Sequence, residues 1–264
     1  MKPNGVVTLL TDFGLVDSYV AAMKGVLLSM APAATLVDIS HLVPRHDIAA
    51  GAYVLASAAP NFPEGTVHLA VVDPGVGSSR AAVALRTQSA WYVGPDNGLL
   101  WQAAGESVEE LVIIDRVPGY TRPRSSTFHG RDLFAPAAGH IVRGGELSEL
   151  GAGVHALSPL EVPWARRAGH VVEGVVVHVD GFGNIVTNIR REDLPESSER
   201  VVVKIEGVLI RGLVTCYDEV PEGTLCALFG SEDRLEISVS SGSASKRLGV
   251  DRGAGVVCRV IEEP

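Results

Sequence analysis

The stretch TVHLAVVDPGVGSSR, residues 66–80, decides the fold. Its first seven residues form a nearly continuous apolar run, which is typical of a strand buried on both faces of a parallel sheet. The run ends at Asp73, and a turn rich in glycine and serine leads to Arg80. Ligands of open α/β sheets bind beyond the carboxyl ends of the strands. This stretch therefore predicts a central strand and, directly after it, part of a functional site.

The same pattern extends over residues 1–154. Apolar runs alternate with segments of helical spacing, which predicts an α/β domain with a largely parallel sheet. One helix is expected after an N-cap at Asp17, with an apolar side formed by Val20, Met23, Leu27 and Met30. Further strands are expected at 6–10, 35–39, 81–86, 91–93 and 110–115, and further helices from about 47 to 59 and over 132–143, the last with Pro136 in its first turn.

After Gly153 the character of the sequence changes. Residues 155–170 contain proline and arginine and lack apolar periodicity, which is typical of a linker between domains. Residues 171–264 carry β-branched runs separated by Gly, Pro, Asp and Ser turns, so a smaller all-β, barrel-like domain is expected there. The runs lie at 171–179, 185–189, 200–205, 208–214, 224–229, 235–239 and 255–261.

Charge and composition exclude several classes of protein. The formal net charge is −9 and the 22 basic residues form no run, so nucleic acid is not expected as a partner. No window approaches ~18 consecutive apolar residues, and the first ten residues lack a secretory leader, so we expect a cytoplasmic protein without membrane spans.

The cysteines and histidines indicate no metal site. The three cysteines are far apart and fit neither a disulfide framework nor a zinc site, so they are expected to be small buried hydrophobes. The eight histidines include no His-x-x-x-His pair. A metal-dependent hydrolase is therefore the weakest alternative.

Five motifs stand out, four of them directly after predicted strands or before a predicted helix. They are TDFG (11–14), VVDPGVGSSR (71–80), GPDNGLL (94–100), TFHGRD (127–132) and DGFGNIVTNI (180–189). With these motifs in this order, the chain resembles the S-adenosyl-L-methionine hydroxide adenosyltransferases, the water-using relatives of the fluorinating and chlorinating enzymes. The resemblance runs from Thr8 to about Leu248.

The resemblance implies hydrolysis of S-adenosyl-L-methionine (SAM) to adenosine and L-methionine without a cofactor. It also implies a seven-stranded α/β domain, a smaller β-barrel domain, and a homotrimer with active sites between neighbouring subunits. The family's catalytic Asp, Arg and His fall on Asp73, Arg80 and His129.

The chemistry of the reaction suits these three residue types. The sulfonium of SAM leaves as a neutral thioether, so catalysis needs a well-placed nucleophile rather than an acid. Water has a pKa of about 15.7, and the permanent charge of Arg80 favours hydroxide. His129 is the expected proton acceptor and Asp73 orients the water or shares the proton, with the final holder left open. Without the motifs, Asp73 would read as a turn residue, Arg80 as a surface charge and His129 as a helix cap.

In the first domain, the resemblance assigns two acids to substrate binding. Asp12 corresponds to the carboxylate that accepts both ribose hydroxyls. Asp17 corresponds to a second acid near the same pocket, although the N-cap role explains it equally well.

In the second domain, the resemblance assigns five binding residues. Asp180 corresponds to the residue facing the methionine ammonium, Phe182 to the one packed on adenine and Asn184 to the one reading an adenine edge. Ser231 corresponds to a contact of the methionine carboxylate, with Glu236 close by. Phe182 as core and Glu236 as a surface strand residue stay open alternatives.

Two other functions stay open. A sensor could bind SAM or adenosine without turnover, but the catalytic trio would then have no task. The halogenating relatives place Tyr at Asp73 and Ser at Gly130, and they carry a long insertion between the strands at 81–93. The chain lacks all three features, so water is the expected nucleophile.

Overall fold

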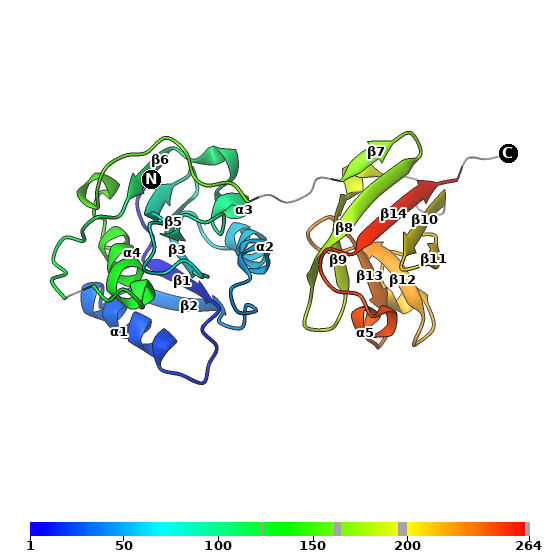
Figure 1. The fold of residues 1–264 in the computed structure, drawn as a ribbon, viewed down its shortest axis with the longest axis horizontal. Helices are drawn as coiled ribbons and strands as arrows, with labels where there is room; N and C mark the ends of the chain where they lie inside the picture. Colours follow the sequence, from blue (N-terminus) through cyan, green and yellow to red (C-terminus); the bar gives the residue numbers. More distant parts are fainter. Residues whose placement is uncertain (123, 161–164, 195–199, 262–264) are drawn as a thin grey trace. The chain divides into compact units, whose positions relative to one another are not determined.

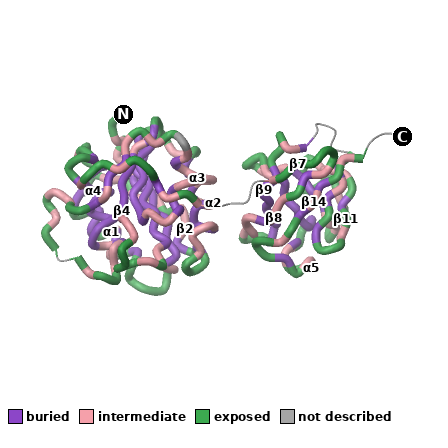
Figure 2. The backbone as a smooth tube through the Cα atoms, turned by 45° about the horizontal axis from the view of Figure 1, so that its top comes forward, coloured by how far each residue is buried: buried purple, intermediate pink, exposed green. Residues whose placement is uncertain are grey.

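The computed structural model describes residues 1–122, 124–160, 165–194 and 200–261 (Figure 1). The chain divides into two compact units, Met1–Glu161 and Val162–Pro264. Each unit buries its own apolar core, and the strands of both are largely buried (Figure 2).

The first unit contains a mixed sheet of six described strands in the order β2-β1-β3-β5-β4-β6. The four strands β2, β1, β3 and β5 are parallel, as predicted, whereas β4 runs antiparallel to β5 and β6. The turn between β4 and β5 has only three residues, and a parallel crossover needs a dozen or more. The described sheet has six strands, whereas the family resemblance implied seven. The strands are β1 Val6–Thr11, β2 Thr35–Ser40, β3 Thr66–Val71, β4 Ala82–Arg86, β5 Ala90–Pro95 and β6 Glu110–Ile113.

Helices cover both faces of this sheet. Helices α1 (Tyr19–Met30) and α4 (Ala135–Val142) pack on one face, and α2 (Ile48–Ala58) and α3 (Trp101–Ala104) on the other (Figure 1). All four apolar residues predicted for the side of α1 are buried. Short 3-10 turns lie at η1 Ala59–Asn61, η2 Gly105–Ser107 and η4 Leu147–Glu149.

Two helix starts differ from the prediction. The N-cap of α1 is Ser18, without a side-chain hydrogen bond, and Asp17 is an exposed residue one position earlier. The helix expected over 132–143 begins as a π-helical turn, η3 (Gly130–Phe134), and continues as α4 with Pro136 in the first turn. Pro136 has no N–H to donate, and the first turn of a helix is where this loss is tolerated.

The order of the strands contains a topological switch point. The chain places β2 on one side of β1 and then β3 on the other, so the connections reverse direction between β1 and β3. Such a switch point leaves a crevice at the carboxyl ends of the strands. Thr11 pairs in register with Val71 at these ends. The residues that follow, including Asp12 and Asp73, therefore leave the sheet at the same edge.

The second unit is an antiparallel, nearly closed barrel-like sheet in the order β11-β10-β14-β8-β9-β13-β12, with β7 paired to β8. The N–H of Val214, beyond the end of β11, donates to the carbonyl of Ala227 in β12 at 2.9 Å, which links the two outer strands of this order. The strands are β7 Arg166–Ala168, β8 Val171–Val179, β9 Ile185–Arg190, β10 Val201–Ile205, β11 Val208–Arg211, β12 Leu225–Phe229, β13 Arg234–Val239 and β14 Gly255–Val260.

The barrel-like sheet confirms the expected architecture of this unit, which also contains the short helix α5 (Ala244–Leu248) and the 3-10 turns η5 (Arg191–Asp193) and η7 (Tyr217–Glu219). The hydroxyl of Ser243 caps α5 by accepting from the N–H of Lys246 at 3.3 Å, and Gly249 ends the helix at a φ of 63°. A serine cap and a left-handed glycine are sufficient to stop a short helix at both ends.

The stretch 155–170 is structured on both sides of residues 161–164, which lie outside the described residues. Leu157 is buried in the first unit, where the N–H of Ser158 donates to Asp96 at 2.7 Å. Residues 166–168 form β7. The predicted linker is therefore shorter than expected.

Cys226 and Cys258 are buried as expected, whereas Cys216 is exposed. No helix among the described residues is long and apolar enough to cross a membrane.

Candidate active site

Asp73, Arg80 and His129 come together at the carboxyl edge of the first sheet. Arg80 Nε donates to Asp73 Oδ1 at 2.8 Å, and Arg80 Nη2 donates to Asp73 Oδ2 in a second, shorter bond. Arg80 Nη2 also lies 2.8 Å from His129 Nδ1. One guanidinium therefore holds a carboxylate and an imidazole in fixed positions.

The three residues reach this position from different elements. Asp73 follows β3, Arg80 precedes β4, and His129 stands immediately before η3. The turn after β3 packs closely on the segment before η3, because a Cβ on Gly77 would lie 2.4 Å from the carbonyl oxygen of Ser126. Gly77 also has a φ of 77°. A glycine is required here by both the close approach and the left-handed backbone.

The ion pair is well shielded. The side chains of Arg80 and Asp73 are 10% and 4% exposed, and the Arg80 guanidinium lies 5.1 Å from the centre of the Phe134 ring. Low exposure strengthens the attraction between the charges, and the second hydrogen bond compensates for the loss of water.

The geometry defines the protonation of His129. An arginine only donates hydrogen bonds, so His129 Nδ1 must accept, and the ring is then neutral with its proton on Nε2. Burial lowers the pKa of His129, and the charge of Arg80 lowers it further. The expectation that His129 is the proton acceptor conflicts with this arrangement, because Nδ1 is already engaged and Nε2 already carries a proton.

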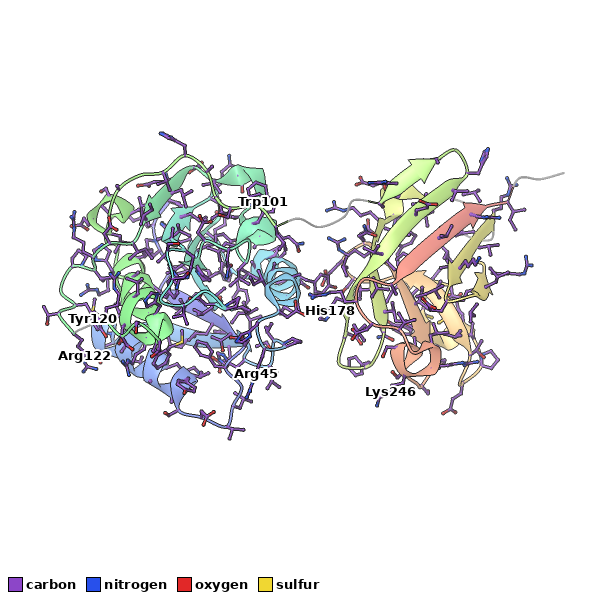
Figure 3. The ribbon with its side chains drawn as sticks, viewed as in Figure 1. Arg45, Trp101, Tyr120, Arg122, His178 and Lys246 are labelled. Carbon is purple, nitrogen blue, oxygen red and sulfur yellow. The ribbon has the colours of Figure 1, made fainter. Side chains whose placement is uncertain are left out.

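A second arginine, Arg124, acts on the trio through its charge. The segment before His129 contains Arg122 and Arg124, and the charge of Arg124 contributes to the lowered pKa of His129. Figure 3 shows Arg122 beside Tyr120 in the first unit, and its charge acts on the Tyr120 hydroxyl. The hydroxyl of Tyr120 is buried and makes no hydrogen bond with the part of the chain that is described.

Asp12 lies directly after β1 at the same edge of the sheet. Its Oδ2 accepts from the backbone N–H of His46 at 2.9 Å, and His46 has a φ of 63°, which is rare for a residue other than glycine. Figure 3 shows Arg45, the residue before His46, on the segment between β2 and α2. Asp17 is exposed and is not joined to this group.

In the second unit, Asp180 and Asn184 form one hydrogen-bonded turn. Asp180 Oδ1 accepts from the N–H groups of Phe182 and Asn184 at 2.9 and 2.8 Å, and Asp180 Oδ2 accepts from Asn184 Nδ2 at 2.9 Å. Within the described residues, hydrogen bonds engage only one N–H of the Asn184 amide, so its oxygen and second N–H can bind a ligand. The ring of Phe182 is 83% exposed, so it is not a core residue.

Glu236 is buried rather than a surface strand residue, and a residue that the sequence did not single out joins it. Glu236 Oε1 accepts from Tyr217 Oη at 2.7 Å and from Ser238 Oγ at 3.1 Å. Burial raises the pKa of Tyr217, and the bond to Glu236 and the charge of Asp180 raise it further. Ser231 is exposed in the turn between β12 and β13, and its neighbour Gly230 packs on Glu236, because a Cβ on Gly230 would lie 2.4 Å from Glu236 Oε2.

Comparisons with known proteins now give the family. The family model for the SAM hydroxide adenosyltransferase N-terminal domain matches residues 7–151, and the model for the C-terminal domain matches residues 174–257. The chain belongs to the SAM hydroxide adenosyltransferase family. It is 41% identical to a protein of Thermus thermophilus named (R)-S-adenosyl-L-methionine hydrolase, over 97% of this chain and 99% of that protein.

Two further proteins are similar to this chain at lower sequence identity. A fluorinase of Actinoplanes sp. is 29% identical over 80% of each chain. A solved structure of an uncharacterized conserved protein from Thermotoga maritima matches with a TM-score of 0.90 and 33% identity, over 96% of this chain and 99% of that one.

Within this adenosyltransferase, the GPDNGLL motif has a structural task. Asn97 Nδ2 donates to the carbonyl of Val72 at 2.9 Å, and Asn97 Oδ1 accepts from the N–H of Leu99. Asn97 therefore ties the end of β5 to the end of β3, one residue before Asp73.

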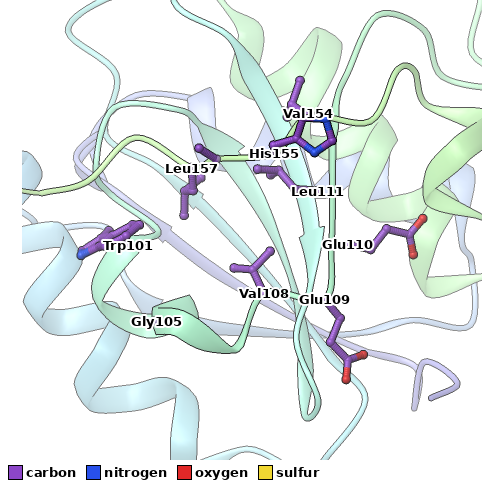
Figure 4. A pocket seen from close by; sticks show the side chains of 10 residues that line it. Trp101, Gly105, Val108, Glu109, Glu110, Leu111, Val154, His155 and Leu157 are labelled. Carbon is purple, nitrogen blue, oxygen red and sulfur yellow. The ribbon is translucent and has the colours of Figure 1, made fainter.

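The structure also contains a hollow away from the trio. It encloses about 440 Å³ beside β6 and is lined by Trp101, Gly105, Val108, Glu109, Glu110, Leu111, Val154, His155, Ala156 and Leu157 (Figure 4). None of the site residues expected from the sequence lies in this lining. Among the described residues, no group of three or more His, Cys, Asp or Glu side chains is arranged to hold a metal ion.

Proposed function

We propose that the protein hydrolyses SAM to adenosine and L-methionine by in-line attack of water on the ribose C5′. The observation that carries this proposal is the Asp73–Arg80–His129 cluster at the switch point of the sheet. The name of the 41% identical Thermus relative supports the same reaction.

The reaction balances without an added acid. The water oxygen forms a bond to C5′ while the bond from C5′ to sulfur breaks, and the electron pair leaves with sulfur, which becomes the neutral thioether of methionine. One water proton must depart. We assign its acceptance to Asp73, because His129 in the observed arrangement presents a donor, Nε2–H, and no free acceptor.

Arg80 and His129 then position the nucleophile. Arg80 keeps its charge throughout the reaction, so it favours the hydroxide character that develops on the water. The Nε2–H of His129 can donate to one water lone pair and aim the other at C5′. Positioning of this kind contributes on the order of 7–11 kcal/mol in well-oriented reactions.

The substrate-binding roles expected from the family are part of the proposal. Asp12 accepts the ribose hydroxyls with Asp17 nearby, Asp180 and Asn184 recognise the ammonium and the adenine edge, and the exposed Phe182 packs on adenine. The methionine carboxylate falls to Ser231, with Glu236 close by. The exposed ring of Phe182 and the hydrogen-bonding groups that remain on the Asn184 amide support these roles.

Water is favoured over a halide by the surroundings of Gly130. A Cβ at this position would lie 3.1 Å from Met23 Sδ and 3.2 Å from Phe13 Cε2, so the serine of the halogenating relatives would displace packed side chains. Asp73 replaces their tyrosine, and the turn between β4 and β5 has three residues in place of their long insertion.

Product analysis tests this choice of nucleophile. The protein is treated with EDTA and incubated with SAM in buffers with and without chloride and fluoride, and the nucleosides are separated by mass spectrometry. We expect adenosine at the same rate in every buffer. A 5′-halogenated nucleoside would overturn the water proposal, and binding of SAM without any nucleoside product would indicate the sensor alternative.

We also propose a cytoplasmic homotrimer in which the active site forms between subunits. Large apolar side chains are exposed in both units, including Leu15, Val16 and Leu42 in the first and Phe182 in the second, and such side chains are typical of surfaces that become covered. Light scattering coupled to gel filtration tests the oligomer. A monomeric mass for a fully active protein would contradict it.

A further inference from the structure

A buried histidine without a part in the proposed chemistry lies behind Asp12. His41 directly follows β2, and its side chain is 2% exposed. His41 Nδ1 lies 2.8 Å from Thr11 Oγ1 at the end of β1, and His41 Nε2 lies 3.0 Å from Asp38 Oδ1 in β2. The Nε2 contact has the distance of an ion pair without the alignment of a hydrogen bond.

The charged groups beside His41 indicate which atoms donate and which accept in these contacts. Burial raises the pKa of Asp38, but the hydrogen bond and charge of Lys24, together with the adjacent His41 ring, outweigh it, so the pKa is lowered and Asp38 is a carboxylate. A carboxylate beside Nε2 favours the tautomer with the proton on that nitrogen, in which Nδ1 accepts from the hydroxyl of Thr11. The hydroxyl oxygen of Thr11 in turn accepts from the N–H of Phe13 at 3.2 Å.

His41 therefore holds the segment after β1 at two points. Through Thr11 it binds the N–H of Phe13, and through its own carbonyl it accepts from the N–H of Gly14 at 2.8 Å. Asp12 stands between these two points, with its carboxylate bonded to the N–H of His46. The direction of the Asp12 carboxylate is thus defined by the segment 41–46 and by the Thr11 hydroxyl.

We propose that Asp38, His41 and Thr11 form a positioning relay that holds Asp12 in the orientation needed to bind the two ribose hydroxyls. This inference rests on the proposed role of Asp12 in ribose binding. In this proposal the relay acts on Asp12 through the backbone of Phe13, which bonds to the Thr11 hydroxyl, and of Gly14, which bonds to the His41 carbonyl.

The chain offers a matched control for the relay. Thr8, also in β1, makes the same kind of buried contact, with Thr8 Oγ1 2.8 Å from His68 Nδ1. Thr8→Val and Thr11→Val each remove one hydroxyl from a threonine–histidine pair in the same strand. Only Thr11 adjoins the segment that carries Asp12, so only its replacement is expected to disturb ribose recognition.

The test is binding of adenosine and of 2′,3′-dideoxyadenosine to the full-length protein by calorimetry. We expect the wild type to prefer adenosine, and Asp12→Asn to lose this preference. Thr11→Val should weaken adenosine binding by about tenfold, as for the loss of one well-placed hydrogen bond, and leave dideoxyadenosine binding unchanged. Thr11→Ser should restore the preference, and Thr8→Val should match the wild type.

Three results would overturn the relay. They are full preference for adenosine in Thr11→Val, an equal loss for both nucleosides in Thr11→Val, or a loss of preference in Thr8→Val as large as that in Thr11→Val. If the wild type itself shows no preference, the ribose role of Asp12 fails and the relay fails with it. Should Thr11→Val not fold, Asp38→Asn at the partly exposed end of the relay takes its place, with the same expected selectivity and the same refutation.

Discussion

At the scale of single residues, the site depends on what Arg80 can bind at one time. Its planar guanidinium donates to both oxygens of Asp73 and to one nitrogen of His129, an arrangement that a lysine could not reproduce with its single charged nitrogen. The same contacts that fix the geometry also fix the proton on His129 Nε2. The Arg80 guanidinium therefore determines both the positions of Asp73 and His129 and the protonation of the His129 ring.

Asp73→Asn tests the pairing. The change leaves Arg80 buried without its counter-charge, so we expect the free energy of unfolding to fall by about 3 kcal/mol. If Asp73 accepts the water proton, kcat should fall at least about 100-fold with little change in KM. Steady-state kinetics and urea unfolding measure both effects. Glu109→Gln, which breaks the exposed pair with Arg86, is the control and should alter stability by less than about 0.5 kcal/mol.

The pH dependence tests the neutral state of His129. Burial and the charge of Arg80 lower the pKa of His129 below the usual 6.5, so the ring stays neutral as the pH falls through that value. Activity should therefore persist below pH 6.5 and decline only when the lower pKa of the folded protein is reached. An acidic limb of kcat centred above 6.5 would contradict the assignment.

At the scale of elements, the π-helical turn η3 determines how His129 meets Arg80. Its first residue, Gly130, packs against Met23 of α1 and against Phe13 and Phe128. The rings of Phe13 and Phe128 meet edge to face at 6.0 Å. The turn therefore packs on an aromatic pair, and a larger residue at position 130 would require Met23 and Phe13 to shift.

A pair of glycine substitutions tests this packing. Gly130→Ala should destabilise the protein by about 1–3 kcal/mol, because the added methyl overpacks the site. Gly25→Ala, on the exposed side of α1 where a Cβ would meet no atom within 4 Å, should instead stabilise it by about 0.5–1 kcal/mol. Urea unfolding measures both. Equal effects of the two changes would refute the packing argument.

Apolar runs predicted most strands, because burial on both faces of a sheet leaves a strong local pattern. The direction of β4 depends on the length of the turn before β5, and β7 consists of three exposed residues that pair with β8. The cap at Ser18 lies one residue from the predicted Asp17, since either residue type can occupy such a position. These features depend on contacts that the local sequence does not reveal.

The candidate site was likewise predictable from the sequence only in part. The motifs predicted Asp73, Arg80 and His129 as a group, but the state of the His129 proton depends on which nitrogen faces Arg80. The sequence did not single out Tyr217, because no motif surrounds it. Tyr217 joins the candidate site through one hydrogen bond to the buried Glu236. The relay behind Asp12 likewise exists only through the pairing of β1 with β2.

At the scale of the whole molecule, a second buried histidine predicts acid sensitivity. Burial lowers the pKa of His68 to about 4 from the usual 6.5. The unfolded chain therefore binds the proton more tightly, so the stability is fully present above pH 6.5 and is lost as the pH falls toward about 4. The loss should reach about 3 kcal/mol. Urea unfolding at several pH values measures it, and His68→Gln should show a smaller decrease; an unchanged pH dependence would contradict this origin.

The most direct test of the central claim uses water labelled with oxygen-18. The metal-free protein is incubated with SAM in the labelled water, and the adenosine formed is analysed by mass spectrometry. Attack of water on C5′ predicts adenosine that carries the heavy oxygen at its 5′-hydroxyl, together with unlabelled methionine. Adenosine without the label, or no adenosine from a protein that binds SAM, would contradict the proposed reaction.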